Sequence, residues 1–117
     1  MKIELTEDKL VIKFSLKEKL EAVKGGLEIP ISSIVDIKPF KDAGVDTSPA
    51  WFVHMGTYLG KTGLGSFPTS KGWTFMATKD IDNSTVLFLK DFNYNLAIID
   101  LDEKTLEELK ERIKNLK

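Results

Sequence analysis

The sequence predicts a mostly β domain of the α+β class. Several short segments alternate apolar and polar residues, which is the pattern of half-buried strands. Residues 51–75 interleave aromatic side chains with five glycines, which favours bent or bulged strands. Only the C-terminal segment has a helical period. We therefore expect about seven antiparallel strands, a short helix after the second strand and a C-terminal helix that closes the structure.

One domain is expected to span residues 1–117, because this length is about that of a single globular unit. Hydrophobic residues make up 42% of the chain and charged residues 30%, which is close to ordinary globular composition. No internal repeat, low-complexity tract or linker divides the sequence. The composition therefore predicts one hydrophobic core.

The N-terminal segment predicts a β-hairpin. Residues 2–6 and 10–15 each alternate between apolar and polar side chains, and Glu7-Asp8 between them is a typical tight turn. Residues 16–23 (LKEKLEAV) then favour one or two helical turns. Gly25-Gly26 follows, where a helix commonly ends in a left-handed residue.

The middle of the chain predicts further strands around a long loop. Pro30 is tolerated only at a strand edge or end, so we expect a break before the next strand, residues 33–39. Residues 40–49 are polar and rich in turn-forming residues, which predicts a surface loop. Residues 85–90 and 95–101 are two more strands and form the clearest hairpin.

The C-terminal segment predicts an amphipathic helix that packs on the sheet. Its apolar residues recur at intervals of three and four: Leu106, Leu109, Ile113 and Leu116. Asp102 is placed to cap the helix N-terminus, and Glu108 and Arg112 are spaced as an (i, i+4) ion pair.

The order of these elements resembles that of the pleckstrin-homology-like (PH-like) barrel. The resemblance is carried by His54-Met55-Gly56-Thr57, Gly60, Gly65-Ser66-Phe67, Gly72 and Phe75. These residues are similar to the glycine-punctuated centre of small, mostly uncharacterised bacterial and archaeal PH-like proteins. Residues 28–40 (EIPISSIVDIKPF) resemble the strand that follows the short helix in such proteins. The resemblance implies a PH-like barrel of antiparallel strands and hardly any particular chemistry.

Composition excludes several classes of function. The chain has no cysteine, which rules out disulfides, thiolate metal sites and cysteine nucleophiles. A net charge of −1 is too balanced for a dedicated nucleic-acid-binding protein. No window approaches the roughly 20 apolar residues that span a bilayer, and no signal-peptide pattern follows Met1. We expect a cytoplasmic protein with no nucleic-acid partner and no membrane insertion.

Catalytic and metal-binding patterns are also missing from the sequence. His54 is the only histidine, and no zinc-type or EF-hand spacing surrounds it. Residues 63–66 (GLGS) lack the ending of a phosphate-binding loop, and no nucleophile elbow is present. We therefore predict no catalytic residue, no metal and no cofactor, with His54 hydrogen-bonded locally in a loop or at the barrel end.

Binding of phosphoinositides is also not expected. PH domains that bind these lipids use basic residues around the loop between their first two strands. Here that loop carries Glu7 and Asp8, which would repel an anionic headgroup, and only Lys9 and Lys13 oppose them.

The remaining candidate for a functional surface is an aromatic group after the polar loop: Trp51, Phe52, His54 and Tyr58. Aromatic residues carry much of the energy of protein interfaces, although they also fill cores, as we expect for Phe67, Trp73 and Phe75. Our leading hypothesis is a non-catalytic interaction module that binds a protein partner or itself through residues 40–55 and the adjoining sheet edge. The alternative is a carrier of a small apolar or lipid ligand, or an unrecognised enzyme, with a cavity in the barrel.

Overall fold

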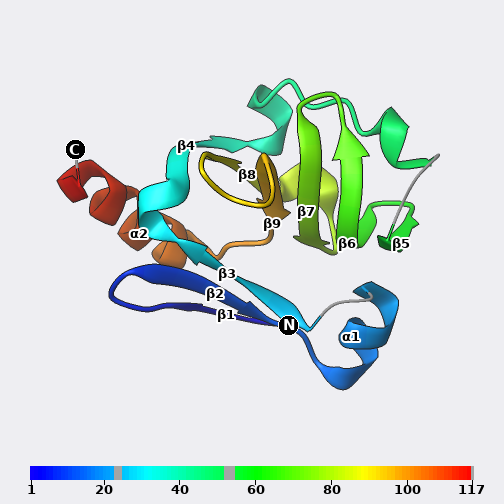
Figure 1. Cartoon of the computed structure of the whole chain (residues 1–117), viewed down its shortest axis with the longest axis horizontal. Coiled ribbons are helices and arrows are strands. Elements are labelled where there is room, and N and C mark those ends of the chain that lie inside the picture. The colour runs from blue at the N-terminus through cyan, green and yellow to red at the C-terminus, as the bar shows by residue number, and fades with distance from the viewer. Residues whose placement is uncertain (23–24, 52–54, 117) are drawn as a thin grey trace.

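The computed structural model describes residues 1–22, 25–51 and 55–116, which form two β-sheets and two α-helices (Figure 1). The smaller sheet has the strand order β1-β2-β3, with bounds Lys2–Leu5, Lys9–Lys13 and Gly26–Pro30. The larger sheet has the order β4-β8-β9-β7-β6-β5, with bounds Ile34–Pro39, Thr85–Leu89, Leu96–Ile99, Gly72–Thr78, Thr62–Thr69 and Met55–Leu59. The helices are α1, Leu16–Ala22, and α2, Glu103–Leu116.

The α+β class and the order of the helices are confirmed, whereas the closed barrel is not. The structure describes nine strands where about seven were expected, and they form two separate sheets. The expectation that all pairs are antiparallel is also wrong, because β7 pairs with β9 in parallel while the other pairs are antiparallel. The parallel pair arises because the β8–β9 hairpin is inserted with β9 against β7 and β8 against β4. Alternation along one strand predicts which face is buried but not which strand lies beside it.

The predicted N-terminal hairpin is confirmed. Lys2 pairs with Lys13 across β1 and β2, and the Thr6 amide donates to the Lys9 carbonyl at 2.9 Å to close the turn. Pro30 ends β3 at the edge of its sheet, where its missing N–H breaks no ladder. A short 3₁₀ turn, η1 (Ile31–Ser33), then carries the chain into β4 of the other sheet.

The short helix α1 begins with a reciprocal cap. The Glu18 amide donates to Ser15 Oγ at 3.3 Å, and the Ser15 amide donates to Glu18 Oε1 at 2.9 Å. Gly26 has a φ of +138° and opens β3, where a Cβ would lie 2.2 Å from the Ile12 carbonyl oxygen. Close pairing of β2 with β3 therefore requires glycine at position 26. From the sequence we expected this glycine for a different reason, namely to end the short helix.

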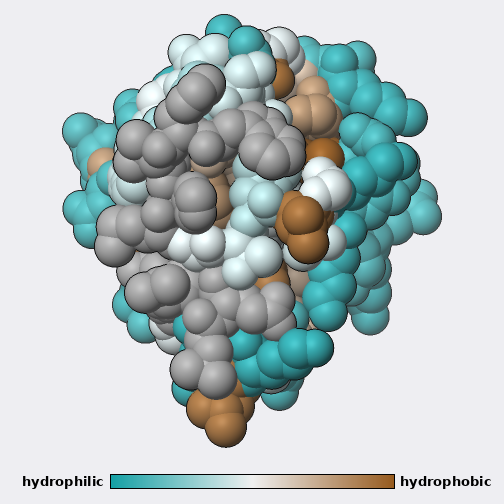
Figure 2. Space-filling view, turned by 90° about the vertical axis from the view of Figure 1, so that its right-hand side faces the viewer, coloured by the Kyte–Doolittle hydropathy of each residue, from teal (hydrophilic) through white to brown (hydrophobic). Residues whose placement is uncertain are grey.

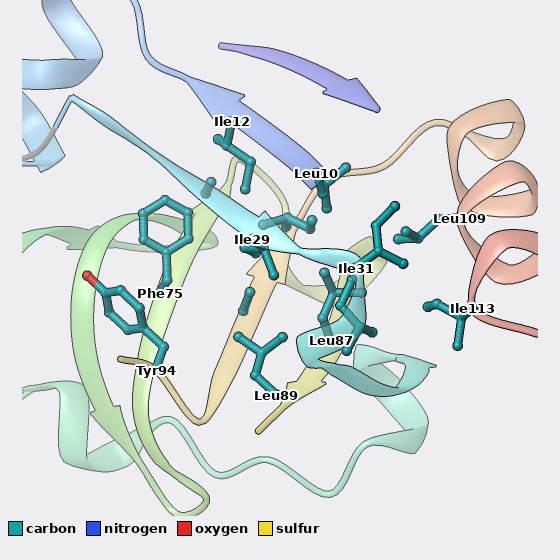
Figure 3. Packing of buried hydrophobic residues seen from close by; sticks show 14 of the residues in the cluster. Leu10, Ile12, Ile29, Ile31, Phe75, Leu87, Leu89, Tyr94, Leu109 and Ile113 are labelled. Atoms are coloured by element: carbon teal, nitrogen blue, oxygen red, sulfur yellow. The ribbon is translucent and has the colours of Figure 1, made fainter. Parts of the chain in front are cut away.

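The buried hydrophobic residues that the structure describes form two clusters on opposite faces of the larger sheet. The first lies between this sheet, the smaller sheet and α2, and its buried members include those labelled in Figure 3. The second lies on the other face. Successive residues of β9 alternate between them: Ala97 and Ile99 belong to the first, and Leu96 and Ile98 to the second. The central strand is thus covered on both sides, which suits its wholly apolar sequence.

The long segment expected as a surface loop also contributes to the core. It contains two 3₁₀ turns, η2 (Phe40–Asp42) and η3 (Ser48–Trp51). Ala43 and Ala50 are buried in the second cluster, and the Asp46 amide donates to Ser70 Oγ at 2.8 Å. The segment therefore covers one face of the larger sheet. A further 3₁₀ turn, η4 (Ile81–Asn83), leads into β8.

The predicted C-terminal helix and its N-terminal cap are confirmed, but the last turn of the helix is not packed as predicted. The Thr105 amide donates to Asp102 Oδ1 at 2.6 Å, which caps the N-terminus, and Glu108 pairs with Arg112 at 3.0 Å. Leu109 is fully buried, but Leu116 is 63% exposed. The predicted packing of the whole apolar stripe is therefore wrong at its last member. None of the described helices has the length and apolar character that crossing a bilayer requires.

Candidate functional site

The surface predicted from the sequence lies partly outside the described residues. Phe52 and His54 are not described, and Trp51 is described only as the end of η3. Tyr58 is half-buried on β5, where its hydroxyl lies 2.8 Å from Thr47 Oγ1 and its ring packs edge-on against Phe67. Tyr58 therefore joins the segment of residues 40–51, which covers this face, to the larger sheet. An interaction surface at Trp51, Phe52, His54 and Tyr58 stays a prediction.

The aromatic residues expected in the core are mostly there. Phe67 and Phe75 are completely buried, and Trp73 is half-buried with its ring stacked on Tyr94. Phe75 packs between the rings of Phe14 and Tyr94, at centroid distances of 5.9 and 5.6 Å. These contacts fill the space around Phe75.

A buried carboxylate, Glu18, joins three parts of the chain. Glu18 Oε1 lies 2.6 Å from the N-terminal ammonium of Met1, and Oε2 lies 3.6 Å from Lys79 Nζ, just beyond β7. Burial alone would raise the pKa of Glu18. Hydrogen bonds from the N-terminal ammonium and from the amide and hydroxyl of Ser15 outweigh it and lower this pKa to about 2. Glu18 is therefore ionised at neutral pH, which suits a structural ion pair and not proton transfer.

No metal site is formed by the part of the chain that the structure describes. Its histidine, aspartate and glutamate side chains include no group of three or more that could hold an ion. The expected absence of a metal or cofactor remains a prediction from the sequence.

A hollow among the described residues lies between the β1–β2 turn and the last turn of α2. It has a volume of about 560 Å³. Three apolar side chains, Leu5, Ile31 and Leu116, line it together with the exposed carboxylates Glu7 and Asp8. We call this hollow the hairpin cleft.

Hydrogen bonds hold the walls of the hairpin cleft together. The guanidinium of Arg112 donates to the Thr6 carbonyl oxygen and also to Glu108, so it ties α2 to the hairpin turn. The Ile31 amide donates to the Asp8 carbonyl at 2.9 Å, which fixes the turn to η1. The cleft is thus preformed, because each wall is bonded to its neighbour.

A second hollow of about 240 Å³ adjoins the first on the other side of Leu116. The two share Ile31, Ser32 and Leu116, and the second adds Val35 and Lys90. We call it the β4 groove. Val35 is 44% exposed, so two large apolar side chains, Val35 and Leu116, stand open to solvent in adjoining hollows.

The charges at the two ends of this surface have opposite signs. Glu7 and Asp8, at the hairpin end, form no ion pair with any described residue. Lys90, at the other end, is exposed and likewise has no ion-pair partner within the described ranges. Lys110 lines a further shallow hollow beside Val35, which it shares with Asp36.

The opposite end of the molecule has a different surface. Figure 2 shows that end, where brown hydrophobic atoms are interspersed with teal and white ones around the residues drawn in grey. In Figure 1 the β1–β2 turn, η1 and the end of α2 all lie at the left, away from the face shown in Figure 2.

The sequence signals for this site were visible but were interpreted differently. The sequence predicts a tight turn and a poor lipid-binding loop at Glu7 and Asp8, and it places Leu116 in the packed stripe of α2. The signal that could have found the cleft is the position of Leu116 at the very end of that stripe, next to the polar residues Asn115 and Lys117. Comparison with protein-family models, curated proteins and solved structures finds no match, so function must be inferred from the chain's own residues.

Proposed function

We propose that this chain is a non-catalytic interaction module whose contact surface is the hairpin cleft together with the β4 groove. One observation carries the proposal: Leu116, 63% exposed, stands between two adjoining hollows with apolar lining residues, and hydrogen bonds hold the walls of the first, the hairpin cleft, together. Exposed apolar residues grouped in a hollow and rimmed by polar side chains are typical of sites that bind proteins.

The chemistry of the lining residues supports binding over catalysis. The described lining of the hairpin cleft includes hydroxyls of Thr6 and Ser32 but no described histidine that could act as a base. The carboxylates of Glu7 and Asp8 are exposed at the tip of a turn, where solvent screens them. Such a site can hold a partner through apolar contact and charge.

A small apolar or lipid ligand is the second candidate, and the volume of the hairpin cleft supports it. The cleft, at about 560 Å³, lies in the range of roughly 300–1,000 Å³ that is typical of small-ligand pockets. Native mass spectrometry of the purified protein separates the two candidates, because a bound ligand adds a discrete mass to the monomer.

Membership of the PH-like group belongs to the same proposal. A short helix after the second strand and a helix at the C-terminus support it, whereas the two-sheet arrangement does not favour it over other α+β folds. A cytoplasmic location and a bacterial or archaeal source are part of the same expectation.

Site-specific photo-crosslinking tests the contact surface. A photoreactive residue is introduced at Leu116, at Leu59 beside the aromatic group predicted from the sequence, or at Leu16 as a control of comparable exposure. We expect protein adducts in the producing cells at position 116 and few at position 16. Adducts at position 59 alone would move the contact surface to β5, and equal labelling at all three positions would contradict a defined surface.

A further inference from the structure

We propose that the partner at this surface is a second copy of the same chain, arranged around a two-fold axis beside Leu116. This inference rests on the proposed function, since it names the occupant of the same contact surface. The observation that supports it is the pattern of charge across the two hollows. This pattern is self-complementary, because a copy of the surface turned about a two-fold axis presents opposite charges to it.

The surface has an apolar centre with an acidic flank and a basic flank. Leu116 and Val35 form the exposed centre, Glu7 and Asp8 lie on one side, and Lys90 lies on the other. A two-fold axis that runs between the flanks places the acidic flank of one copy against the basic flank of the other, and the reverse. Two-fold interfaces use the same patch on both subunits, so they require this kind of self-complementarity.

The other charges nearby do not change the sign of either flank. Arg112 lines the hairpin cleft, but it is engaged by Glu108 at 3.0 Å and by the Thr6 carbonyl. Asp36 and Lys110 both line a further hollow beside Val35 and balance each other in net charge, so Lys90, which lines the β4 groove itself, gives that flank its positive sign. The hairpin carboxylates are the uncompensated anions of the acidic flank.

A second copy fits this pattern better than a partner with one sign of charge. A basic peptide would satisfy Glu7 and Asp8 but would be repelled by Lys90, and an acidic peptide would meet the reverse problem. In a dimer of two copies, both charged flanks face opposite charges in one contact. Leu116 and Val35 of each copy are also covered by the other copy.

Charge reversal with mixing tests this arrangement. The acid-reversed variant is Glu7→Lys with Asp8→Lys, and the base-reversed variant is Lys90→Glu with Lys110→Glu. Each alone puts like charges on both flanks, so its own dimer should weaken at least tenfold, because like charges across an interface cost several kcal/mol. An equimolar mixture should form a dimer of one copy of each variant with about the affinity of the wild type, since every flank then faces a flank of opposite charge.

Sedimentation velocity from micromolar to millimolar concentration is the measurement, with thermal unfolding to confirm that each variant is folded. Lys17→Glu with Lys71→Glu is the control matched to the base-reversed variant, since it makes the same change in net charge at exposed lysines that line neither hollow. This control should dimerise as the wild type does, and Leu116→Asp should be monomeric.

Three results would overturn the inference: a wild type that is monomeric throughout, reversed variants that still dimerise, or a mixture that stays monomeric. A monomeric wild type together with specific adducts to other proteins at position 116 would leave the proposed function standing and remove only the second copy. Absence of any adduct at that position would remove both.

Discussion

The two halves of α2 show how the same apolar stripe can serve different purposes. Leu109 and Leu116 lie on one face of the helix, two turns apart, yet the first is fully buried and the second is 63% exposed. Leu109 faces the first core cluster, close to Ile31 and Leu10 in Figure 3, whereas Leu116 stands between two open hollows. An apolar side chain with the right period is buried only where the rest of the fold supplies a surface to cover it.

Truncation of these two leucines should separate a core position from an exposed one. We expect Leu109→Ala to lower the free energy of unfolding by about 2–5 kcal/mol, because it leaves a cavity in the core. Leu116→Ala should change it by less than about 0.5 kcal/mol, as is usual for exposed sites. Urea unfolding measures both, and equal effects would show that the end of α2 is packed like its middle.

The second largest effect is expected at Glu18. Glu18→Gln leaves the N-terminal ammonium without its buried counter-charge, and it weakens hydrogen bonds to a charged group that are worth roughly 1.5–3 kcal/mol. Chemical unfolding at pH 7 measures the loss. A loss below about 0.5 kcal/mol would show that the ion pair contributes nothing net.

The same residue predicts a pH dependence of stability. The pKa of Glu18 is about 2 in the folded chain, below the ordinary glutamate pKa of 4.5, so the folded state favours the ionised form. Its contribution is therefore complete above the unfolded-state pKa and is lost as the pH falls from about 4.5 toward 2. The stability of the wild type should fall over that range more steeply than that of Glu18→Gln, and parallel curves would contradict the assignment.

A smaller loss than at Glu18 is expected at Arg112, which ties α2 to the hairpin turn. Arg112→Gln should cost about 1 kcal/mol, as for the loss of an ordinary hydrogen bond. Amide hydrogen exchange should also become faster in the turn around Thr6, while the core strands keep their protection. Lys114→Gln, on an exposed residue of the same helix, is the control and should leave both measurements unchanged.

The local elements of this chain could be predicted from its sequence because each depends on neighbouring residues. Alternation predicted the N-terminal hairpin, the spacing of Leu106 to Leu116 predicted α2, and Asp102 predicted its cap. Turn chemistry at Glu7-Asp8 and the position of Pro30 likewise depend on a few adjacent residues.

The pairing of distant strands and the surface between distant elements could not be predicted in this way. Placement of β9 beside β7 depends on how the β8–β9 hairpin docks, and the hairpin cleft joins residues 5–8 to residues 112–116. Neither the β7–β9 pairing nor the cleft produces a periodic pattern in the sequence. Periodicity indicates which face of a segment is buried but not which other segment covers that face. The exposure of Leu116 is the clearest case, since its spacing is identical in kind to that of its buried neighbours, and only the shape of the surrounding fold leaves it open.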